Sequence, residues 1–521
     1  MRIVVVGGVA GGMSCAARAR RLDEQAEIIV LERGEHVSFA NCGLPYYVGG
    51  EIADRSSLLV QTPASLKAAL DLDVRPGHEV TGLDAAARTV TVRTASGETT
   101  LDYDALVLSP GATAFRPPID GLDSPRVRTL RTVDDAVALR EKVDGGARRA
   151  VVLGAGFIGI EAAEALAEAG LETTVVELAP HVLPPLDDEQ AHPITQELRR
   201  LGIDVRTGVA ASAIEPGDDH DTVVLGDGDR IDADLIVLSV GVRADTAVFE
   251  AAGIECERGA IVVDEHGRTS LDGVWAVGDA TISTDPVTGA RRPVALAGPA
   301  NRAGRLIADA IVRGDEARRI PMPLGTAIVR VGELTAAMTG ANRRSLEQAG
   351  VAHRTLHLHP NNHAGYFPGA SAVSLAVHID DEGRILGAQG VGRDGVDKRI
   401  DVIATAIRGG LRVDDLIDLD LSYSPPYGQA KDAVNLVGYV GENVLTGTLR
   451  LWDARELDEV REAAAGRPVR VLCASGVRSH IAHRVLEQAG FDSASLSGGM
   501  KTLLATLGDR AREVLEFGVA E

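Results

Sequence analysis

Near its start the chain reads Arg2-Ile3-Val4-Val5-Val6-Gly7-Gly8-Val9-Ala10-Gly11-Gly12, an apolar run followed by a glycine-rich turn. The β-branched run predicts a buried strand of a parallel sheet. A helix is expected over 13–22, and then a second strand over 26–31 that ends at Glu32. This spacing predicts dinucleotide binding, because glycines admit a pyrophosphate to the helix N-terminus and the acid accepts hydrogen bonds from ribose hydroxyls. Val9 replaces the middle glycine of the pattern, which weakens the motif taken alone. The prediction therefore depends also on the strand, the helix and Glu32.

The same pattern recurs in the middle of the chain. A strand over 150–153 precedes an intact Gly154-Ala155-Gly156-Phe157-Ile158-Gly159, then a helix over 160–169 and a strand over 172–176 that ends at Glu177. Glu177 would accept hydrogen bonds from a 2′-hydroxyl but repel a 2′-phosphate. NADH is therefore expected, and NADPH is kept as the alternative.

A third segment, over 269–280, places Asp279 directly after Gly278 at the end of an expected strand. In flavoproteins with two dinucleotide units, such an aspartate contacts the ribityl chain of FAD. Strands over 103–111 and 234–241 are expected to return the chain between the two units, so the NAD unit is inserted into a split FAD unit. The residues expected to bind these cofactors are Gly7, Gly8, Ala10, Gly11, Gly12, Glu32, Arg33, Val80, Ser109, Gly111, Gly154, Gly156, Phe157, Ile158, Gly159, Glu161, Glu177, Gly241, Gly278, Asp279 and Ala297.

Composition limits the classes of function. The 521 residues are 45% hydrophobic and 25% charged, which suits a soluble protein of three or four domains. A formal net charge of -22 disfavours nucleic acid as a partner. No apolar segment approaches the roughly 20 residues that cross a bilayer, and glycines break the apolar start, so we expect a cytoplasmic protein without a membrane partner.

The cysteines indicate redox chemistry. The chain has four, with neither a CxxC pair nor metal-ligand spacing, so we expect free thiols and no metal site. Cys15, on the first expected helix, and Cys256, in an expected polar turn, are predicted to be structural residues without a redox role. Cys42 lies in Ser38-Phe39-Ala40-Asn41-Cys42-Gly43-Leu44-Pro45-Tyr46-Tyr47, where flavin-linked disulfide reductases usually have two cysteines. Its redox partner must therefore come from elsewhere.

With these motifs, residues 1–445 resemble the pyridine nucleotide-disulfide oxidoreductase family, and within it the single-cysteine coenzyme A-disulfide reductases. The most specific segments are 38–47, 363–369 and 421–427. The resemblance implies an α/β interface domain that forms a homodimer, with tyrosines that reach the partner's active site. Tyr366 and Tyr423 look most like the family's pair, whereas Tyr427 suits interface packing equally well.

The residue types suggest a reaction. Pro45 near the start of a helix places the Cys42 sulfur near a helix N-terminus, which favours the thiolate. The expected cycle passes hydride from NADH to FAD, then electrons to a mixed disulfide of Cys42 with coenzyme A, which leaves as the thiol. A tyrosine hydroxyl would protonate the leaving thiolate, and which tyrosine does so is left open.

The phosphates of coenzyme A require cations. Arg18 and Arg21 lie three apart on one helix face and match positions that help bind coenzyme A in the resembling family. Solvated arginines on an exposed helix face are the alternative. Ser38 and Asn41 are expected to hydrogen-bond near the thiol arm.

A competing function uses the same scaffold. Flavoprotein NADH oxidases and peroxidases also have one cysteine, which cycles between thiolate and sulfenic acid. The peroxidase pattern has a histidine in the first glycine turn, where this chain has Ala10, and this weakens the alternative. Oxygen reduction by the flavin is left open as a secondary activity.

The sequence changes after Gly447. A strand is expected to end at Cys473, and a loop and a helix follow, which makes an anion-binding nest of amides around a thiolate. This loop and residues 496–500 resemble the active loop and closing motif of rhodanese sulfurtransferase domains, which are associated with persulfide and polysulfide reduction. An early strand and a helix-loop segment are not recognisable between Trp452 and Pro468. We therefore expect a truncated module, in which an active Cys473 and a structural remnant both stay open.

The expected architecture is an α/β chain of four parts. Two Rossmann-like dinucleotide-binding domains, an α/β dimerisation domain and a small rhodanese-like α/β appendix follow one another. The expected bounds are 1–112 and 245–320 for the FAD domain, 113–244 for the NAD(P) domain, 321–445 for dimerisation and 450–521 for the appendix.

Overall fold

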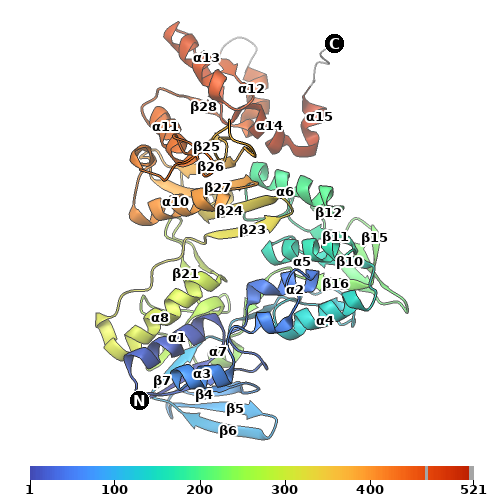
Figure 1. Ribbon diagram of the computed structural model, residues 1–521, viewed down its shortest axis with the longest axis vertical. Coiled ribbons are helices and arrows are strands. Elements are labelled where there is room, and N and C mark those ends of the chain that lie inside the picture. Colours follow the sequence, from blue (N-terminus) through green and yellow to red (C-terminus); the bar gives the residue numbers. More distant parts are fainter. Residues whose placement is uncertain (464–467, 516–521) are drawn as a thin grey trace.

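The computed structural model describes residues 1–463 and 468–515. Four main sheets follow one another along the long axis of the molecule, with the N-terminus near one end and residues 468–515 at the other (Figure 1). This arrangement confirms the predicted α/β fold class. Within the described residues, no helix is long and apolar enough to cross a membrane, and no group of three or more His, Cys, Asp or Glu side chains could hold a metal ion.

The first sheet is parallel, in the order β20-β7-β1-β2-β3. At its centre lies β1 (Arg2–Val6), between β2 (Glu27–Leu31) and β7 (Ala105–Leu108). The edges are β3 (Asp73–Arg75) and β20 (Val274–Ala276). Because β20 follows the whole second sheet in the sequence, the chain leaves the first sheet and later returns to complete it.

Two layers cover the first sheet. The helices α1 (Ala10–Leu22) and α8 (Ala297–Arg313) lie side by side over one face (Figure 1). An antiparallel meander covers the other face. Its strands are β4 (Glu79–Asp84), β5 (Thr89–Thr94) and β6 (Gly97–Asp102).

The second sheet is also parallel, in the order β12-β11-β10-β16-β9. Its strands are β9 (Val127–Arg128), β10 (Arg149–Leu153), β11 (Glu172–Glu177), β12 (Asp204–Thr207) and β16 (Leu235–Leu238). Helices and a meander complete this module: α4 (Val133–Asp144), α5 (Phe157–Glu168), α6 (Asp188–Arg200), β13 (Ala211–Glu215), β14 (Asp221–Leu225) and β15 (Arg230–Ala233). The outgoing and returning connections to the first module run side by side, because β8 (Ala112–Ala114) pairs with β17 (Val242–Ala244).

The third sheet is antiparallel, in the order β23-β24-β27-β26-β25. Its strands are β23 (Ala327–Val331), β24 (Leu334–Gly340), β25 (Arg354–Leu358), β26 (Ser374–Ile379) and β27 (Ile385–Gly392). One face packs on α10 (Val396–Gly409) and α11 (Ala433–Leu445). The first two strands contribute to the apolar core of the second module, which joins the two modules.

The C-terminal appendix has a three-stranded parallel sheet in the order β28-β30-β29. Its elements are β28 (Leu451–Trp452), α12 (Leu457–Ala463), β29 (Val469–Val471), α13 (Val477–Gln488), β30 (Ser493–Leu496) and α14 (Gly499–Leu507). The expectation that this region lacks an early strand and a helix was wrong, because β28 and α12 supply them. A two-residue strand is too short to show an alternating pattern.

Close packing between α1 and α8 depends on Gly304, where an added Cβ would lie 2.1 Å from the carbonyl oxygen of Gly11. We predict that Gly304→Ala lowers stability by about 1–3 kcal/mol through overpacking, although alanine favours helix formation. The matched control is Gly298→Ala on the same helix, where the nearest atom, Arg302 Nη1, lies at an ordinary 3.5 Å. Thermal unfolding of the two variants checks this, and equal or raised midpoints for both would refute it.

Candidate active site

The first glycine turn joins β1 to α1 and has a backbone that only glycine permits. Gly7 has φ +100°, and an added Cβ there would lie 1.9 Å from the carbonyl oxygen of Ser109. A Cβ at Gly12 would lie 2.0 Å from the Gly7 oxygen. The amide of Gly8 donates to Glu32 Oε2 at 2.8 Å, so the acid at the end of β2 fixes the turn.

The second glycine turn has the same construction. Gly154 has φ +101°, and a Cβ at Gly159 would lie 2.0 Å from the Gly154 oxygen. The amide of Ala155 donates to Glu177 Oε2 at 2.7 Å. A Cβ at Gly156 would meet nothing within 4 Å, so open space faces the start of α5. Since the first amides of a helix have no partner within it, both turns fit a dinucleotide pyrophosphate.

Several predicted cofactor residues gather beside the first turn. A Cβ at Gly11 would lie 3.0 Å from Val277 Cγ1 and 3.1 Å from Ser109 Oγ, so β7, the end of β20 and α1 meet here. Asp279 follows in the short helix η3 (Gly278–Ala280). Burial raises the pKa of Asp279, and the guanidinium of Arg131, 3.6 Å away, opposes that rise.

The remaining predicted cofactor residues are spread more widely. Gly111 and Gly241 lie beside the paired connections, with φ +72° and +108°, and a Cβ added at either would meet nothing within 4 Å. Arg33 forms an ion pair with Asp245. Val80 packs in the core under the meander. Five others lie at the starts of helices: Ala10 begins α1, Ala297 begins α8, and Phe157, Ile158 and Glu161 lie in the first two turns of α5.

Cys42 lies where the two parallel modules meet. It belongs to η1 (Asn41–Gly43), which leads into the six-residue helix α2 (Leu44–Gly49). α2 packs on α5 so closely that a Cβ at Gly49 would lie 3.1 Å from Ala165 Cα. The residue is exposed and its thiol is free.

The predicted low pKa of Cys42 was wrong for this chain. The atoms packed around the sulfur, followed by the Glu161 carboxylate, raise the pKa of the thiol. A helix of six residues has too small a dipole to offset a nearby carboxylate. Cys42 is therefore held towards the thiol form here.

A polar cluster beside Cys42 was not predicted. Tyr46 Oη donates to Glu161 Oε1 at 3.2 Å, and burial together with Glu161 raises the pKa of Tyr46 to about 12. Burial also raises the pKa of Glu161. Arg330 of β23 lies over the Tyr46 ring, with Cζ 5.2 Å from its centroid, and pairs with Glu51. Tyr46 stands in the cysteine motif and was recognisable there, whereas nothing in the sequence marks Arg330.

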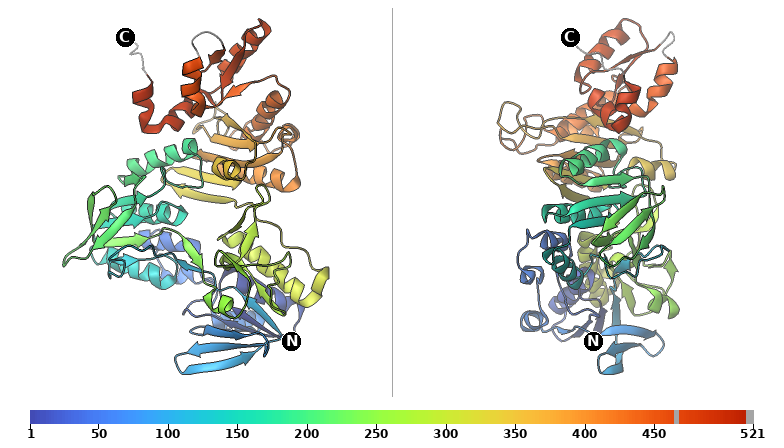
Figure 2. Two further views of the ribbon diagram at one scale, coloured as in Figure 1. Left: turned by 180° about the vertical axis from the view of Figure 1, so that it is seen from behind. Right: turned by 90° about the vertical axis from the view of Figure 1, so that its right-hand side faces the viewer.

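The predicted tyrosines lie on exposed loops of the third module. Tyr366, Tyr423 and Tyr427 are 77%, 48% and 74% exposed, and the neighbouring Phe367 is 38% exposed. The hydroxyls of Tyr366 and Tyr423 lie 3.4 Å apart. This hydrogen bond to Tyr423 raises the pKa of Tyr366. Loops in orange tones project from this module in the right-hand view of Figure 2.

The residues predicted to bind coenzyme A differ in their freedom. Arg18 donates to Asp309 Oδ1 of α8 through Nε and Nη2, at 2.9 and 2.7 Å. Arg21 is exposed, and its Nη1 donates to the Ala17 carbonyl of its own helix at 3.1 Å. Asn41 is exposed beside Cys42, and Ser38 has a positive φ of 46°. Of the two arginines, Arg21 is the one not held by a carboxylate.

The appendix encloses Cys473 in a loop of hydrogen-bond donors. Burial raises the pKa of Cys473, but hydrogen bonds from the Ser479 hydroxyl and from the amides of Ser479, Ser475 and Gly476 lower it to about 6. Ser479 Oγ lies 3.5 Å from the sulfur. A thiol with this pKa is mostly thiolate at neutral pH. The predicted amide nest is therefore formed.

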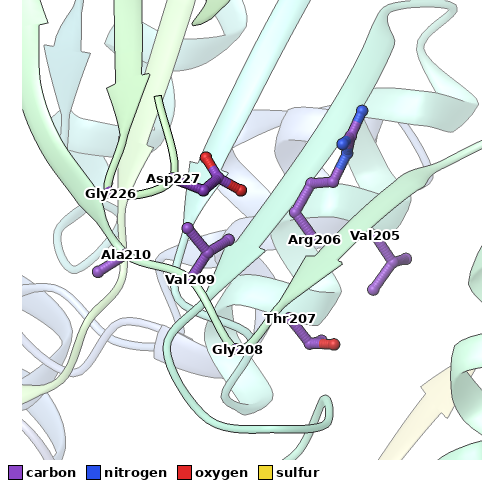
Figure 3. Close-up of a pocket in the computed structure, with 8 residues that line it drawn as sticks. All are labelled: Val205, Arg206, Thr207, Gly208, Val209, Ala210, Gly226 and Asp227. Carbon is purple, nitrogen blue, oxygen red and sulfur yellow. The ribbon is translucent and has the colours of Figure 1, made fainter. Parts of the chain in front are cut away.

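An open hollow of about 570 Å³ lies at the carboxyl end of β12 (Figure 3). Residues 205–210, Gly226 and Asp227 line it. The amide of Val209 donates to the Glu177 carbonyl at 3.2 Å, so the hollow adjoins the strand end that carries the acid of the second turn.

Comparisons with known proteins extend over nearly the whole chain. The family model described as pyridine nucleotide-disulphide oxidoreductase matches residues 1–304, and the model of that family's dimerisation domain matches residues 326–434. A coenzyme A disulfide reductase of Staphylococcus haemolyticus is 34% identical over 443 residues, which are 84% of this chain and 98% of the relative.

Solved structures agree with this assignment. Reduced CoADR-RHD of Bacillus anthracis superposes with a TM-score of 0.93 at 38% identity, covering 98% of each chain, so the likeness includes the appendix. An NAD-dependent persulfide reductase from A. fulgidus gives 0.91 at 35% identity, over 96% of this chain and 100% of that one. A water-forming NADH oxidase from Lactobacillus brevis gives 0.82 at 26%, over 86% and 99%.

The matched family model covers more than half of the chain, and the two glycine turns fit its nucleotides. The chain therefore belongs to the pyridine nucleotide-disulphide oxidoreductase family as an enzyme that uses FAD and NAD(H), which confirms the resemblance predicted from its sequence.

Proposed function

We propose that the enzyme reduces coenzyme A disulfide, or a persulfide or polysulfide of coenzyme A, through Cys42. The observation that carries this proposal is the isolation of an exposed thiol at the junction of the two nucleotide modules. All four cysteines are free: Cys15 is buried in α1, Cys256 begins β18 (Cys256–Glu257), and Cys473 lies in the appendix. Since no other cysteine lies on the elements around Cys42, its disulfide partner is a diffusible thiol.

The chain's residues have distinct roles in this reaction. Bound FAD supplies the two-electron relay between NADH and sulfur. The two glycine turns, with Glu32 and Glu177, would hold the nucleotides, and Asp279 would contact the ribityl chain of FAD. Cys42 forms a mixed disulfide with one half of coenzyme A disulfide and expels the other half as the thiol. Two electrons and two protons then restore the Cys42 thiol and release the second coenzyme A thiol. Since the hydride of NADH accounts for both electrons and one proton, one NADH and one further proton yield two coenzyme A thiols.

Two groups of side chains are suited to move protons in this reaction: Glu161 beside Cys42, and the Tyr366–Tyr423 pair. Because the pKa of Cys42 is raised, the thiol needs a base when it attacks. Glu161 is the carboxylate whose charge contributes to that rise, and we propose it as the base. We propose that the Tyr366–Tyr423 pair protonates the leaving thiolate across a homodimer interface. Their exposure on a module matched by the dimerisation model supports this. A partner subunit would cover these aromatic side chains.

The relatives support the choice of substrate. One is named coenzyme A disulfide reductase and another is named NAD-dependent persulfide reductase. We propose that Arg21, with Ser38 and Asn41, contacts coenzyme A, and that Arg18 contributes only if its pair with Asp309 opens. Cys473 is proposed to carry sulfur as a persulfide in a rhodanese-like appendix. A reducing cytoplasm would keep all four cysteines as thiols.

The domain bounds predicted from the sequence are retained as part of this proposal. The return of β20 to the first sheet supports an FAD domain of 1–112 and 245–320 split by an NAD(P) domain of 113–244. The third sheet supports a dimerisation domain of 321–445, and the appendix follows from 450.

We predict that Cys42→Ser abolishes NADH turnover with coenzyme A disulfide while NADH still bleaches the flavin. Serine cannot form the mixed disulfide, but the nucleotide sites are unchanged. Steady-state absorbance at 340 nm and stopped-flow flavin absorbance measure the two steps. Cys256→Ser is the matched control and should retain turnover.

Two comparisons make this test decisive. If wild-type turnover under oxygen alone equals turnover with the disulfide, the enzyme is an oxidase and the proposal fails. Cys473→Ser should keep disulfide reduction and lose sulfur transfer from thiosulfate or polysulfide, and equal transfer rates would make Cys473 a bystander.

Glu177 is expected to set the nucleotide preference. We predict a higher kcat/KM for NADH than for NADPH, and a fall of about 10- to 100-fold for NADH in Glu177→Ala, because hydrogen bonds to a charged group are lost. Glu172→Ala, at the other end of β11, is the control. A wild-type preference for NADPH would remove this assignment.

The tyrosine pair is expected to act in the chemical step. Tyr366→Phe and Tyr423→Phe should each lower kcat about 10²-fold with flavin reduction unchanged, the lower bound for loss of a general acid. Tyr439→Phe on α11 is the control. Sedimentation should show a dimer for all variants, and a monomeric, fully active wild type would contradict the shared site.

A further inference from the structure

The closing segment 496–500 holds the Cys473 loop from outside. The amide of Met500 donates to the Cys473 carbonyl at 2.7 Å, and that of Lys501 to the Ala474 carbonyl at 3.1 Å. A Cβ at Gly499 would lie 2.2 Å from the Cys473 oxygen, 2.7 Å from Gly476 N and 2.9 Å from Ser475 N. The amides of Ser475 and Gly476 are two of the donors that hydrogen-bond the Cys473 sulfur. A shift of the closing segment would therefore move donors of the nest.

The closing segment is itself fixed by groups of the other modules. Ser497 Oγ lies 2.9 Å from His357 Nδ1 of β25 and accepts from the His357 amide at 3.1 Å. His357 Nε2 lies 2.8 Å from Glu189 Oε1, in the first turn of α6. All three residues are at most 6% exposed. A buried chain thus runs from the second module through the third to the appendix.

Hydrogen positions in this chain can be assigned by counting donors. Ser497 has one hydroxyl proton, which it donates to the Thr355 carbonyl at 3.2 Å. Its oxygen must then accept from His357 Nδ1, while Nε2 donates to the carboxylate of Glu189. With these directions, each contact joins a donor to an acceptor.

Charged groups surround the contact between His357 and Glu189. Burial alone would raise the pKa of Glu189, but His357 and Arg343 hold it well below its usual range. Arg343, at the start of α9 (Arg343–Gln348), also lies 3.9 Å from Asp187, which is 3.0 Å from His378. Each of the two buried carboxylates thus contacts a histidine ring and lies near the Arg343 guanidinium.

We propose that His357, held by Glu189, is a positioning residue that clamps Ser497 and so keeps the amides of the Cys473 loop directed at the sulfur. This rests on the proposed function only in taking Cys473 as the sulfur carrier. Its reactivity can be measured without that role. The charged and titratable groups on the two helices flanking the loop are left unchanged by the test variants; they are Arg478, His480, His483, Arg484, Glu487 and Lys501.

The test is the pH profile of Cys473 alkylation by iodoacetamide in the full-length holoenzyme, resolved by peptide mass spectrometry. Ser497→Ala and His357→Gln should raise the midpoint by about one pH unit and slow alkylation about tenfold below pH 6, because one thiolate donor is lost. His357→Asn places an amide donor near the Nδ1 position and should stay close to wild type. Glutamine places its donor towards Glu189 instead.

Controls separate the clamp from general stability. Arg199→Gln removes a 3.0 Å ion pair with Asp509 between the same α6 and appendix, and should leave the profile unchanged. Flavin content and NADH turnover with coenzyme A disulfide confirm folding, and Ser497→Ala alone decides if His357→Gln does not fold. Profiles of Ser497→Ala and His357→Gln that coincide with wild type would overturn the proposal. If the two variants shift the alkylation profile but the wild-type enzyme transfers no sulfur, only the proposed sulfur-carrying role of Cys473 is refuted.

Discussion

The hydrogen bonds from a glycine-turn amide to the acid at the end of the next strand organise both nucleotide modules. Glu32 and Glu177 each accept from a backbone amide of their own turn, at 2.8 and 2.7 Å. Each acid also accepts from a second amide two residues further along its own strand end, at Gly34 or Ala179. Because a carboxylate has about four lone-pair sites, oxygens that hold the turn can still accept from a ribose. The same residue thus shapes the turn and keeps acceptor sites for the nucleotide that we propose it binds.

Cys42 shows how the placement of a thiol between modules conflicts with its activation. At the junction of the two modules the atoms packed around the sulfur, followed by the Glu161 carboxylate of α5, raise the pKa of the thiol. Cys473 shows the opposite solution, since amide and hydroxyl donors outweigh its burial. One thiol depends on a neighbouring base, whereas the other is ionised by its own loop.

Local patterns predicted the fold well, because each glycine turn, its flanking strand and its acid lie within about thirty residues. Contacts between distant segments were not predictable. Arg18 was expected to be free for phosphate, yet Asp309 on a helix nearly three hundred residues away binds it. The helix-start argument for Cys42 failed for the same reason, since the sequence does not show that Glu161 is its neighbour. β28 was missed because its two residues have no periodicity.

The buried charges between α6, β25 and the closing segment constrain how the appendix attaches. An uncompensated charge at such depth costs about 3–5 kcal/mol, so Glu189, Arg343 and His357 tolerate burial only while each contacts its partners. Apolar packing would permit a sliding contact, but directional hydrogen bonds to Ser497 permit one register. The orientation of the Cys473 loop is therefore tied to the first turn of α6, and that turn follows the segment whose Leu183 amide donates to Ala155 of the second glycine turn at 2.8 Å.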